Sequence, residues 1–428
     1  MHSLDVHLNK QLVATLTIDG KEDRYSFVYE NTWIEEGYPI SPHLPFHTVI
    51  SSASIKRFLQ NLLPEGKGLE DLTAYTHLSK YNIYGILQAI GFETSGALYF
   101  GNTRDNEVDK FRPITEEELT GRIDEIEKRS IIIWDRKPRL SLAGVQEKLP
   151  VLLKDGVLGL ADGSLSSTHI LKFQTRRNPH IVINEYFCMV LARAIGLDVA
   201  SVTLRKYGVH PVLMVERFDR IAHNDGSVER MHIIDGCQIL DLPPSYKYER
   251  NFGSGRDVAE IREGASFAKL FAAAQQCEVP ATAKLRLLDW AIYNLIIGNV
   301  DAHGKNISFF VRKSGIAVAP YYDLLSILMH EGIDHELAMA YGDEFDANRI
   351  LGYPLREFAA QTGLKPRLVS LRIKMLCGKV QDALDLYLID LTRLNEEERR
   401  FIGKLKQLIV SRIEQLSESA DEMMKVSY

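Results

Sequence analysis

The 428-residue sequence has few cysteines, no long apolar run and no strong excess of charge. Its four cysteines are Cys188, Cys237, Cys277 and Cys377. They form no CxxC pair, and their wide spacing argues against a zinc knuckle and favours buried free thiols in a reducing compartment. No stretch approaches the roughly 18 apolar residues of a membrane span, and the N-terminus lacks the pattern of a signal peptide. These absences predict a soluble cytoplasmic protein without a membrane partner.

The charges are nearly balanced, with 51 Lys plus Arg against 57 Asp plus Glu and a net charge of −6. This balance counts against a surface built mainly to bind DNA or anionic lipid, although a local basic patch stays compatible with it. Apolar residues make up 45% of the chain and charged residues 25%, which is typical of a globular protein. At roughly 150 residues per domain, the length predicts two or three domains.

Strand and helix patterns are both present, and they predict the α+β class. Strands at 4–8, 12–18 and 25–29 with helices at 55–63 and 83–90 indicate an N-terminal mixed α/β module over residues 1–135. A hairpin of 148–153 and 157–160 around Asp155-Gly156, with strands at 169–173 and 212–215, indicates a sheet-rich lobe over 136–218. Residues 219–428 are predicted to form an all-helical C-terminal lobe. Its expected helices lie at 268–274, 285–297, 355–360, 368–375, 380–388 and 396–416, interrupted by a strand-rich island at 307–319.

The most informative segment is a polar D-x-H-x-x-N loop that follows a strongly apolar helix. Protein kinases place a base Asp and a metal-binding Asn five residues apart, with a second metal Asp after a following hairpin. Asp301 and Asn306 have this separation, and Asp323 follows the expected hairpin. We therefore expect Asp301 to be the base, and Asn306 and Asp323 to hold Mg²⁺. Because Asp and Asn also form Asx turns, the motif alone is compatible with an ordinary polar loop. His303 either contacts a phosphate or shapes the loop through a backbone hydrogen bond.

A kinase also needs a nucleotide site upstream of this loop. Lys172 stands alone in the apolar strand His169–Phe173, where a charge must be paired or bind an anion. Glu185 on the next helix could orient it toward the α- and β-phosphates. The segment Ser141–Lys148 lies where a kinase has its glycine-rich loop, although it contains only one glycine. The strand Met214–Phe218 could present its backbone to an adenine edge. Alternatively, Lys172 lies on an edge strand and reaches solvent, and Ser141–Lys148 is an ordinary turn before a strand.

Six segments in this order resemble the HipA-type serine/threonine protein kinases, the toxins of HipA–HipB toxin–antitoxin pairs. They are SLAGVQEK, THILKF, NEYFCMVLARAIGL, VERFDR, GNVDAHGKN and PYYDLLS, between residues 139 and 326, with fainter similarity toward both ends. The resemblance implies a two-lobed protein-kinase-like fold and the use of ATP and Mg²⁺. It also implies a growth-arresting toxin that phosphorylates a protein such as glutamyl-tRNA synthetase or another aminoacyl-tRNA synthetase. The implied partner is a HipB-like DNA-binding antitoxin, through which operator DNA would mainly be bound.

Family roles carry over to matching positions. Asp301 matches the base, Asn306 and Asp323 the metal ligands, and Lys172 the phosphate-binding lysine. Ser141 matches a serine that is autophosphorylated, and a phosphate dianion there would repel ATP from the loop. Residues Tyr246–Gly255 resemble the activation-loop region. The remaining nucleotide contacts implied by the resemblance are Ala143, Gly144, Val145, Gln146, Glu147, Lys148, Glu216, Arg217, Phe218, His303, Gly304, Lys305 and Tyr322.

Two other functions stay open at this stage. Choline and aminoglycoside kinases use related catalytic loops, so the D-x-H-x-x-N pattern is compatible with a small-molecule kinase. A catalytically weak co-repressor that acts only with a DNA-binding antitoxin is the alternative from another class. Autophosphorylation at Ser141 would favour the toxin kinase over the first alternative, and ATP turnover would exclude the second.

Overall fold

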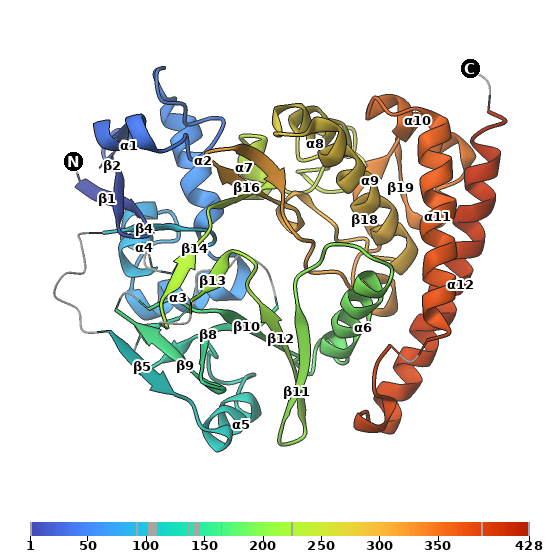
Figure 1. Ribbon diagram of the computed structural model, residues 1–428, viewed down its shortest axis with the longest axis horizontal. Coiled ribbons are helices and arrows are strands. Elements are labelled where there is room, and N and C mark those ends of the chain that lie inside the picture. Colours follow the sequence, from blue (N-terminus) through green and yellow to red (C-terminus); the bar gives the residue numbers. More distant parts are fainter. Residues whose placement is uncertain are drawn as a thin grey trace. The chain divides into compact units, whose positions relative to one another are not determined.

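The computed structural model describes residues 2–90, 93–101, 109–135, 137–139, 146–163, 165–223, 226–386 and 388–426. Helices and strands both occur along the chain (Figure 1), and the predicted α+β class is confirmed. The chain divides into two units. The first unit is Met1–Arg177, Thr203–Pro244 and Phe309–Gly315, and the second is Asn178–Val202, Ser245–Ser308 and Ile316–Tyr428. Both units are discontinuous in sequence, and the domain boundaries expected at residues 135 and 218 stay predictions.

An antiparallel four-stranded sheet begins the first unit, with the order β3-β2-β1-β4. Its strands are β1 (His2–Leu8), β2 (Gln11–Asp19), β3 (Arg24–Tyr29) and β4 (Leu98–Phe100). Val6, Leu16 and Phe27 are buried in it, and the three predicted strands are confirmed. The helices α1 (Asn31–Glu36), α2 (Ser52–Leu62), α3 (Gly66–Thr76) and α4 (Ile83–Ile90) follow β3, and α2 and α4 confirm both predicted helices.

The second sheet of this unit has six strands in the order β11-β12-β10-β8-β9-β5. The strands are β11 (Val202–Tyr207), β12 (His210–Glu216), β10 (His169–Phe173), β8 (Lys148–Lys154), β9 (Val157–Asp162) and β5 (Lys110–Pro113). The β8–β9 hairpin turns through Gly156 at a φ of +79°, as its Asp-Gly pair predicts. The predicted strands at 169–173 and 212–215 are confirmed.

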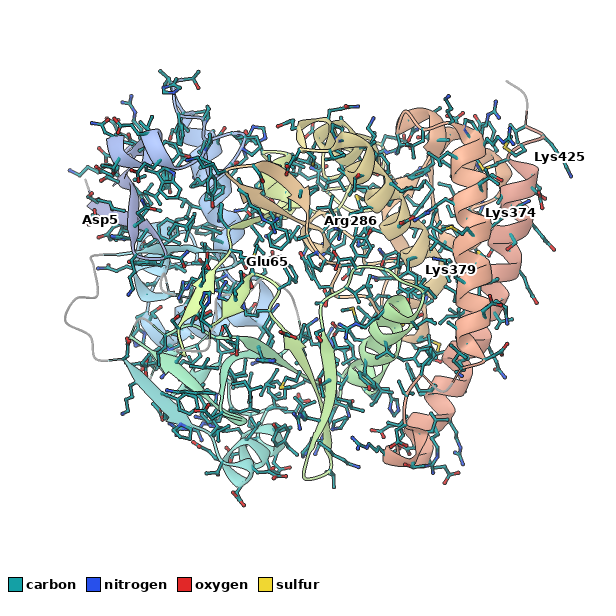
Figure 2. All side chains as sticks on the ribbon, in the orientation of Figure 1. Asp5, Glu65, Arg286, Lys374, Lys379 and Lys425 are labelled. Atoms are coloured by element: carbon teal, nitrogen blue, oxygen red, sulfur yellow. The ribbon has the colours of Figure 1, made fainter. Side chains whose placement is uncertain are left out.

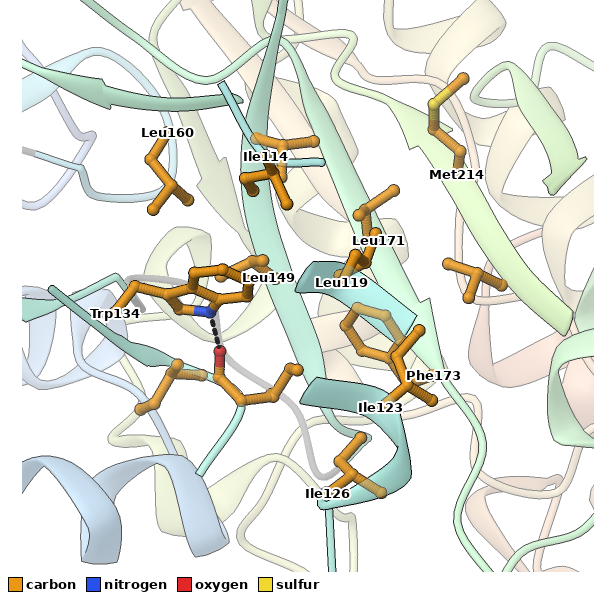
Figure 3. Close-up of a cluster of buried hydrophobic side chains, with 14 residues drawn as sticks. Ile114, Leu119, Ile123, Ile126, Trp134, Leu149, Leu160, Leu171, Phe173 and Met214 are labelled. Atoms are coloured by element: carbon orange, nitrogen blue, oxygen red, sulfur yellow. Dashed lines mark hydrogen bonds between the residues drawn. The ribbon is translucent and has the colours of Figure 1, made fainter. Parts of the chain in front are cut away.

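One face of the six-stranded sheet is covered by helix α5 (Glu116–Asp124) and by Trp134 (Figure 3). Leu149, Leu171 and Phe173 point into this core, and the Trp134 indole Nε1 donates to the carbonyl of Ile131. Side chains alternate between faces along a strand. Therefore Lys148 and Lys172, one position away from Leu149 and Leu171, project from the opposite face.

The second unit is mainly helical. Its helices are α6 (Ile181–Ala194), α8 (Phe267–Ala273), α9 (Pro280–Ile297), α10 (Gly352–Gln361), α11 (Pro366–Leu384) and α12 (Glu396–Glu422). Helices α11 and α12 lie side by side (Figure 1). Arg372 of α11 binds the buried Asp289 of α9 through Nη2 and Oδ2 at 2.5 Å. Within the described residues, no helix is both long enough and apolar enough to cross a bilayer.

The expectation of an all-helical lobe after residue 219 is wrong in one respect, because this region also contains strands. The hairpin β18 (Glu336–Tyr341) and β19 (Glu344–Asp346) lies within the second unit. Its strand ELAMAY is rich in good helix formers, so local propensity gives no strand signal. The helices predicted at 368–375 and 380–388 are one helix, α11, because Gly378 is tolerated inside it.

Several shorter elements complete the fold. The predicted island of strands is confirmed as β16 (Ser308–Arg312) and β17 (Gly315–Val318), which join β15 (Ile233–Asp235) in a sheet of order β15-β16-β17. All four cysteines are free and buried, as predicted. The other short elements are β6 (Ile133–Trp134), β7 (Lys137–Pro138), β13 (Arg220–Ala222), β14 (Val228–Arg230), α7 (Gly236–Ile239) and 3₁₀ turns at 244–246, 274–276, 304–306, 327–329, 347–349 and 391–393.

Candidate active site

The D-x-H-x-x-N loop begins where α9 ends in the second unit. Gly298 ends the helix in the left-handed region with a φ of +69°, a conformation that favours glycine. A Cβ at this position would lie 2.9 Å from Leu328 Cδ1. Asn299 follows, and its Nδ2 donates to Asn294 Oδ1 at 2.8 Å. The buried end of α9 thus fixes the starting point and direction of the loop.

Asp301 is held through its backbone and its side chain. Its carbonyl oxygen accepts from the His303 N–H and from Asn306 Nδ2, each at 2.9 Å. Its Oδ1 accepts from the hydroxyl of Tyr248 at 2.8 Å. The side chain is half-buried, unlike the fully buried residues that follow it. A carboxylate placed this way can reach a hydroxyl group of an incoming molecule.

Asn306 and Asp323 are connected to the same loop. Because Asn306 Nδ2 donates to the Asp301 carbonyl, its side-chain oxygen is the atom available to a cation. Asn299 Nδ2 also donates to the carbonyl oxygen of Asp323 at 3.3 Å. Asp323 has a φ of +58°, a conformation that Asp adopts more readily than most residues. Amide and carboxylate oxygens are the ligands that Mg²⁺ prefers, so this donor set fits the expected metal.

The segment before Asp323 is fixed by hydrogen bonds from its tyrosines. The Tyr322 hydroxyl donates to the Lys305 carbonyl at 2.7 Å and lies 2.8 Å from the Ser308 hydroxyl. Arg286, labelled in Figure 2, extends from α9 and donates to the Ala319 carbonyl at 3.1 Å. Together with the bond from Asn299 to the Asp323 carbonyl, these contacts attach the segment that ends at Asp323 to the loop that carries Asp301 and Asn306.

His303 and its neighbours shape the loop. Its Nδ1 accepts from the Lys305 N–H at 3.2 Å, which is the loop-shaping contact of the two alternatives considered for this residue. A phosphate contact stays a prediction. The Gly304 N–H donates to the carbonyl of Lys247 at 2.9 Å. Residues 304–306 form a 3₁₀ turn with His303 at its start, and all four residues are buried.

Two lysines expected to bind phosphates are neighbours in the first unit. Lys148 on β8 and Lys172 on β10 are directly opposed in the antiparallel register, and they are 8% and 9% exposed. Opposed residues share a face of the sheet. Both ammonium groups could therefore contact one anion bound over this face.

The end of the expected nucleotide loop is attached to β10. Gln146 Nε2 donates to the Phe173 carbonyl at 3.2 Å, and the Phe173 N–H donates to the Glu147 carbonyl at 3.0 Å. The Glu147 carboxylate pairs with Lys67 of α3 at 3.0 Å. The expected nucleotide contacts Ala143, Gly144 and Val145, and the expected autophosphorylation site Ser141, lie outside the described residues.

The expected hinge residues have different surroundings. Glu216 ends β12 with an exposed side chain, and the Phe218 ring lies edge-on to Phe310 at 6.0 Å. The Arg217 side chain instead belongs to a buried ionic cluster, where it binds Glu93 at 2.8 Å and Asp219 at 2.8 Å. Its guanidinium therefore stabilises the fold here, although the sequence predicted a nucleotide contact.

The buried cluster consists of Glu93, Arg217, Asp219, Arg220 and Arg230 of the first unit. Burial by itself raises the pKa of Asp219, but Arg217 and Arg220 hold that pKa well below its usual range. Burial also raises the pKa of Glu93, and Arg230, Arg217 and Arg220 outweigh it. Both acids are thus held in their charged form. Their ion pairs connect the segment before β4, which contains Glu93, to the segment after β12, which contains Asp219.

Glu185 is buried on α6 in the second unit, one residue after an anchor of the site. That anchor is Asn184, whose side chain donates to the Ser326 carbonyl at 2.8 Å and accepts from the Ser326 N–H at 2.9 Å. Lys172 and Glu185 belong to different units, and the ion pair expected between them stays a prediction.

Three residues that contact the site were not expected from the sequence. Tyr248, Asn299 and Lys67 contact Asp301, Asp323 and Glu147 respectively. Asn299 interrupts an apolar run, which is a signal that it has a polar role. Tyr248 and Lys67 are separated from their partners by 53 and 80 residues, and no local pattern indicates such contacts.

Comparisons with known proteins agree with this geometry. The family described as HipA-like C-terminal domain matches residues 140–384, and the HipA N-terminal domain matches residues 4–101. The chain is 41% identical to the serine/threonine-protein kinase toxin HipA of Shewanella oneidensis, over 99% of this chain and 98% of the relative. It is also 33% identical to the Y4mE protein of Sinorhizobium fredii, which is named as a kinase, over 95% of this chain and 99% of the relative.

A solved structure extends the likeness to the whole fold. It is a complex of Shewanella oneidensis HipA, HipB and their operator DNA, with a TM-score of 0.91 and 39% identity. The match covers 99% of this chain and 100% of that one. The chain therefore belongs to the HipA family and is a serine/threonine-protein kinase.

Proposed function

We propose that this chain is the toxin of a HipA–HipB-type pair and phosphorylates a serine or threonine of a target protein, using ATP and Mg²⁺. The observation that carries this proposal is the D-x-H-x-x-N loop, in which Asn306 Nδ2 donates to the Asp301 carbonyl, together with the bond from Asn299 Nδ2 to the Asp323 carbonyl. This arrangement supplies a base and two oxygen ligands from one loop and the segment after the next hairpin, which are the parts that phosphoryl transfer needs.

The residues of the second unit divide the work. Asp301 accepts the proton of the acceptor hydroxyl as the hydroxyl oxygen bonds to the γ-phosphorus and the bond to the leaving ADP breaks. Asn306 and Asp323 would hold the metal through their side-chain oxygens, while the Asn306 nitrogen stays bonded to the Asp301 carbonyl. When bound, ATP supplies the γ-phosphoryl group and Mg²⁺ offsets its negative charge.

The residues of the first unit bind the nucleotide. Lys148 and Lys172, opposed on one sheet face, attract the phosphates and orient them. Gln146, Glu147 and the hinge residues Glu216 and Phe218 contribute the rest of the site. Residues 143–145 would bring backbone N–H groups close to the phosphates, and phosphorylation of Ser141 would inactivate the enzyme by repulsion.

The partners follow from the relatives. The Shewanella structure contains HipB and operator DNA together with HipA, so we expect a HipB-like antitoxin to hold this chain and mainly to contact the DNA. The net charge of −6 fits that division of roles. We expect the phosphorylated protein to be a cytoplasmic protein of the translation machinery, such as glutamyl-tRNA synthetase or another aminoacyl-tRNA synthetase.

The test is transfer of label from γ-labelled ATP with Mg²⁺ to the protein itself and to a cell extract, followed by identification of the labelled protein and residue. The Asp301→Asn variant should label at least about 100-fold more slowly, because general-base catalysis contributes that much or more. Asp421→Asn, which removes an exposed carboxylate of α12 that pairs with Lys374 of α11, is the matched control. Wild-type protein that labels neither itself nor any extract protein would refute the proposal, and label found only on choline or an aminoglycoside would favour a small-molecule kinase.

A further inference from the structure

Tyr248 contacts the proposed base from a distant part of the chain. Its hydroxyl donates to Asp301 Oδ1 at 2.8 Å, although the two residues are 53 apart in sequence. The side chain is 37% exposed, so the contact lies near the surface, where an acceptor would approach. The carboxylate of the proposed base is therefore bonded to the segment that resembles the activation-loop region.

The backbone on both sides of Tyr248 is fixed. The Lys247 carbonyl accepts from the Gly304 N–H at 2.9 Å, and the Glu249 N–H donates to the Ala338 carbonyl at 2.9 Å. A residue between two such bonds cannot move far without breaking one of them. The hydroxyl of Tyr248 is thus delivered to Asp301 by an ordered segment.

Glu249 strengthens this attachment from inside the second unit. It is 4% exposed, its Oε2 accepts from the Ala340 N–H at 2.8 Å, and its Oε1 pairs with Arg262 at 2.5 Å. Arg262 also pairs with Asp343 at 2.6 Å. These contacts join the segment carrying Tyr248 to the β18–β19 hairpin. The Glu249 carboxylate is buried, so its pairing with Arg262 is costly to break.

The aromatic ring of Tyr248 is also restrained. It lies edge-on to the His303 ring, with centroids 5.1 Å apart and planes at 88°. His303 is itself fixed by its hydrogen bond from the Lys305 N–H. The direction of the phenol is therefore set by the same loop that carries Asp301.

From this geometry we propose that Tyr248 is a positioning residue that orients the Asp301 carboxylate toward the acceptor hydroxyl. The backbone carbonyl of Asp301 is fixed by His303 and Asn306, so the carboxylate can change direction only by rotation of the side chain. The Tyr248 hydroxyl restrains that rotation by its hydrogen bond to Oδ1. Because the role is defined by the base, this inference rests on the proposed kinase function.

The proposal predicts a specific kinetic change in Tyr248→Phe. The rate constant kcat for phosphorylation should fall about 10- to 100-fold, the range expected when a catalytic group is misplaced by about 1 Å. KM for ATP and for the protein acceptor should stay within about twofold, since Tyr248 binds neither one. Tyr246→Phe removes a hydroxyl from the same segment at a ring that packs against Phe252, and this variant should retain the wild-type kcat.

A double-mutant cycle shows whether Tyr248 acts through Asp301. In the Asp301→Asn background no base remains to be oriented, so adding Tyr248→Phe should leave the residual rate unchanged. An equal loss in both backgrounds would overturn the proposal, as would a change in KM alone or an unchanged or higher kcat. The cycle also covers a variant that is partly unfolded, because general misfolding lowers the rate in both backgrounds. Wild-type protein without any kinase activity would instead refute the proposed function itself, and this role with it.

Discussion

The buried ionic cluster of the first unit provides a quantitative test of what holds the expected hinge in place. We predict that Asp219→Asn lowers the free energy of unfolding of this unit by about 3–5 kcal/mol, the cost of removing one partner from a buried ion pair. The Asp219 carboxylate accepts from Arg217 and Arg220 at 2.8 Å each and from the Gly96 N–H at 3.0 Å. Asparagine preserves the shape and one acceptor oxygen, so the loss is mainly that of the charge.

The charge count in the cluster supports this magnitude. Three arginines, at positions 217, 220 and 230, face the two carboxylates of Glu93 and Asp219. The cluster carries one excess positive charge, and Asp219→Asn would leave two. Burial is the largest cause that lowers the pKa of Arg220 to about 9, and the neighbouring Arg217 is the second. Further positive charge in the cluster would therefore destabilise the Arg220 cation.

The difference between the two proteins should also depend on pH. The pKa of Asp219 is below its usual value near 3.8 in the folded protein, so its ionisation contributes stability above that value. This contribution is lost as the pH falls through the lowered pKa of the folded state. The stability gap between wild type and Asp219→Asn should therefore be constant near neutral pH and should narrow below about pH 4.

Urea unfolding followed by tryptophan fluorescence measures the effect. Trp33 and Trp134 are in the first unit and Trp290 is in the second, so a Trp290→Phe background for every variant limits the signal to the first unit. Asp23→Asn is the control, because its carboxylate is 62% exposed and pairs with Lys56 at the surface. That control should lose less than about 1 kcal/mol. A similarly small loss in Asp219→Asn would refute the reasoning.

Three further predictions concern the nucleotide site, the catalytic loop and the cysteines. Lys172→Met should weaken ATP binding at least about 10-fold in a fluorescent-nucleotide titration, because it removes one of two cations from the proposed phosphate face; unchanged affinity would contradict that role. Gly298→Ala should cost about 1–3 kcal/mol in denaturant unfolding, because it forces a φ of +69° on alanine and sets a Cβ against Leu328; a neutral effect would show that the loop can shift. The native protein should react slowly with a thiol reagent at pH 8, since burial raises the pKa of Cys277 and of Cys377 to about 11 each. In denaturant all four thiols should react, and rapid reaction of the native protein would contradict the burial.

Local patterns explain why much of the fold could be predicted. The β8–β9 hairpin depends on Asp155-Gly156 and on the apolar runs beside it, all within 15 residues. The spacing of Asp301 and Asn306 is likewise local, and the hydrogen bond between them is part of one turn. By contrast, β18 carries a helix-forming composition, and its strand conformation depends on packing against residues far away in sequence.

The same contrast applies to the candidate site, where residues proposed to perform the reaction differ from residues that hold their segments in place. Asp301, Asn306, Asp323 and Lys172 could be predicted from the sequence because phosphoryl transfer needs those residue types, and their roles stay predictions. The contacts that hold such segments in place are not demanded by the chemistry, and they join residues far apart in sequence: Tyr248 bonds to Asp301 across 53 residues, and Glu93 to Arg217 across 124. Such contacts form only after the chain has folded, so they leave no periodicity or motif.

This division has a consequence for the role assigned to Arg217. Its motif, V-E-R-F-D-R, resembles a family signature near the hinge, and a sequence signature does not separate residues that contact a nucleotide from residues that hold the strand in place. In the structure, Arg217 and Asp219 alternate with Glu216 and Phe218, and the first two point into the buried ionic cluster while Glu216 is exposed. The separation arises where the chain leaves β12 and turns, with the Arg220 N–H donating to the Arg217 carbonyl at 3.3 Å, and Arg220 joins the same cluster through Asp219. Half of such a motif should therefore affect stability when mutated and the other half should affect nucleotide binding, which is the distinction that Asp219→Asn, with its large loss of stability, is designed to expose.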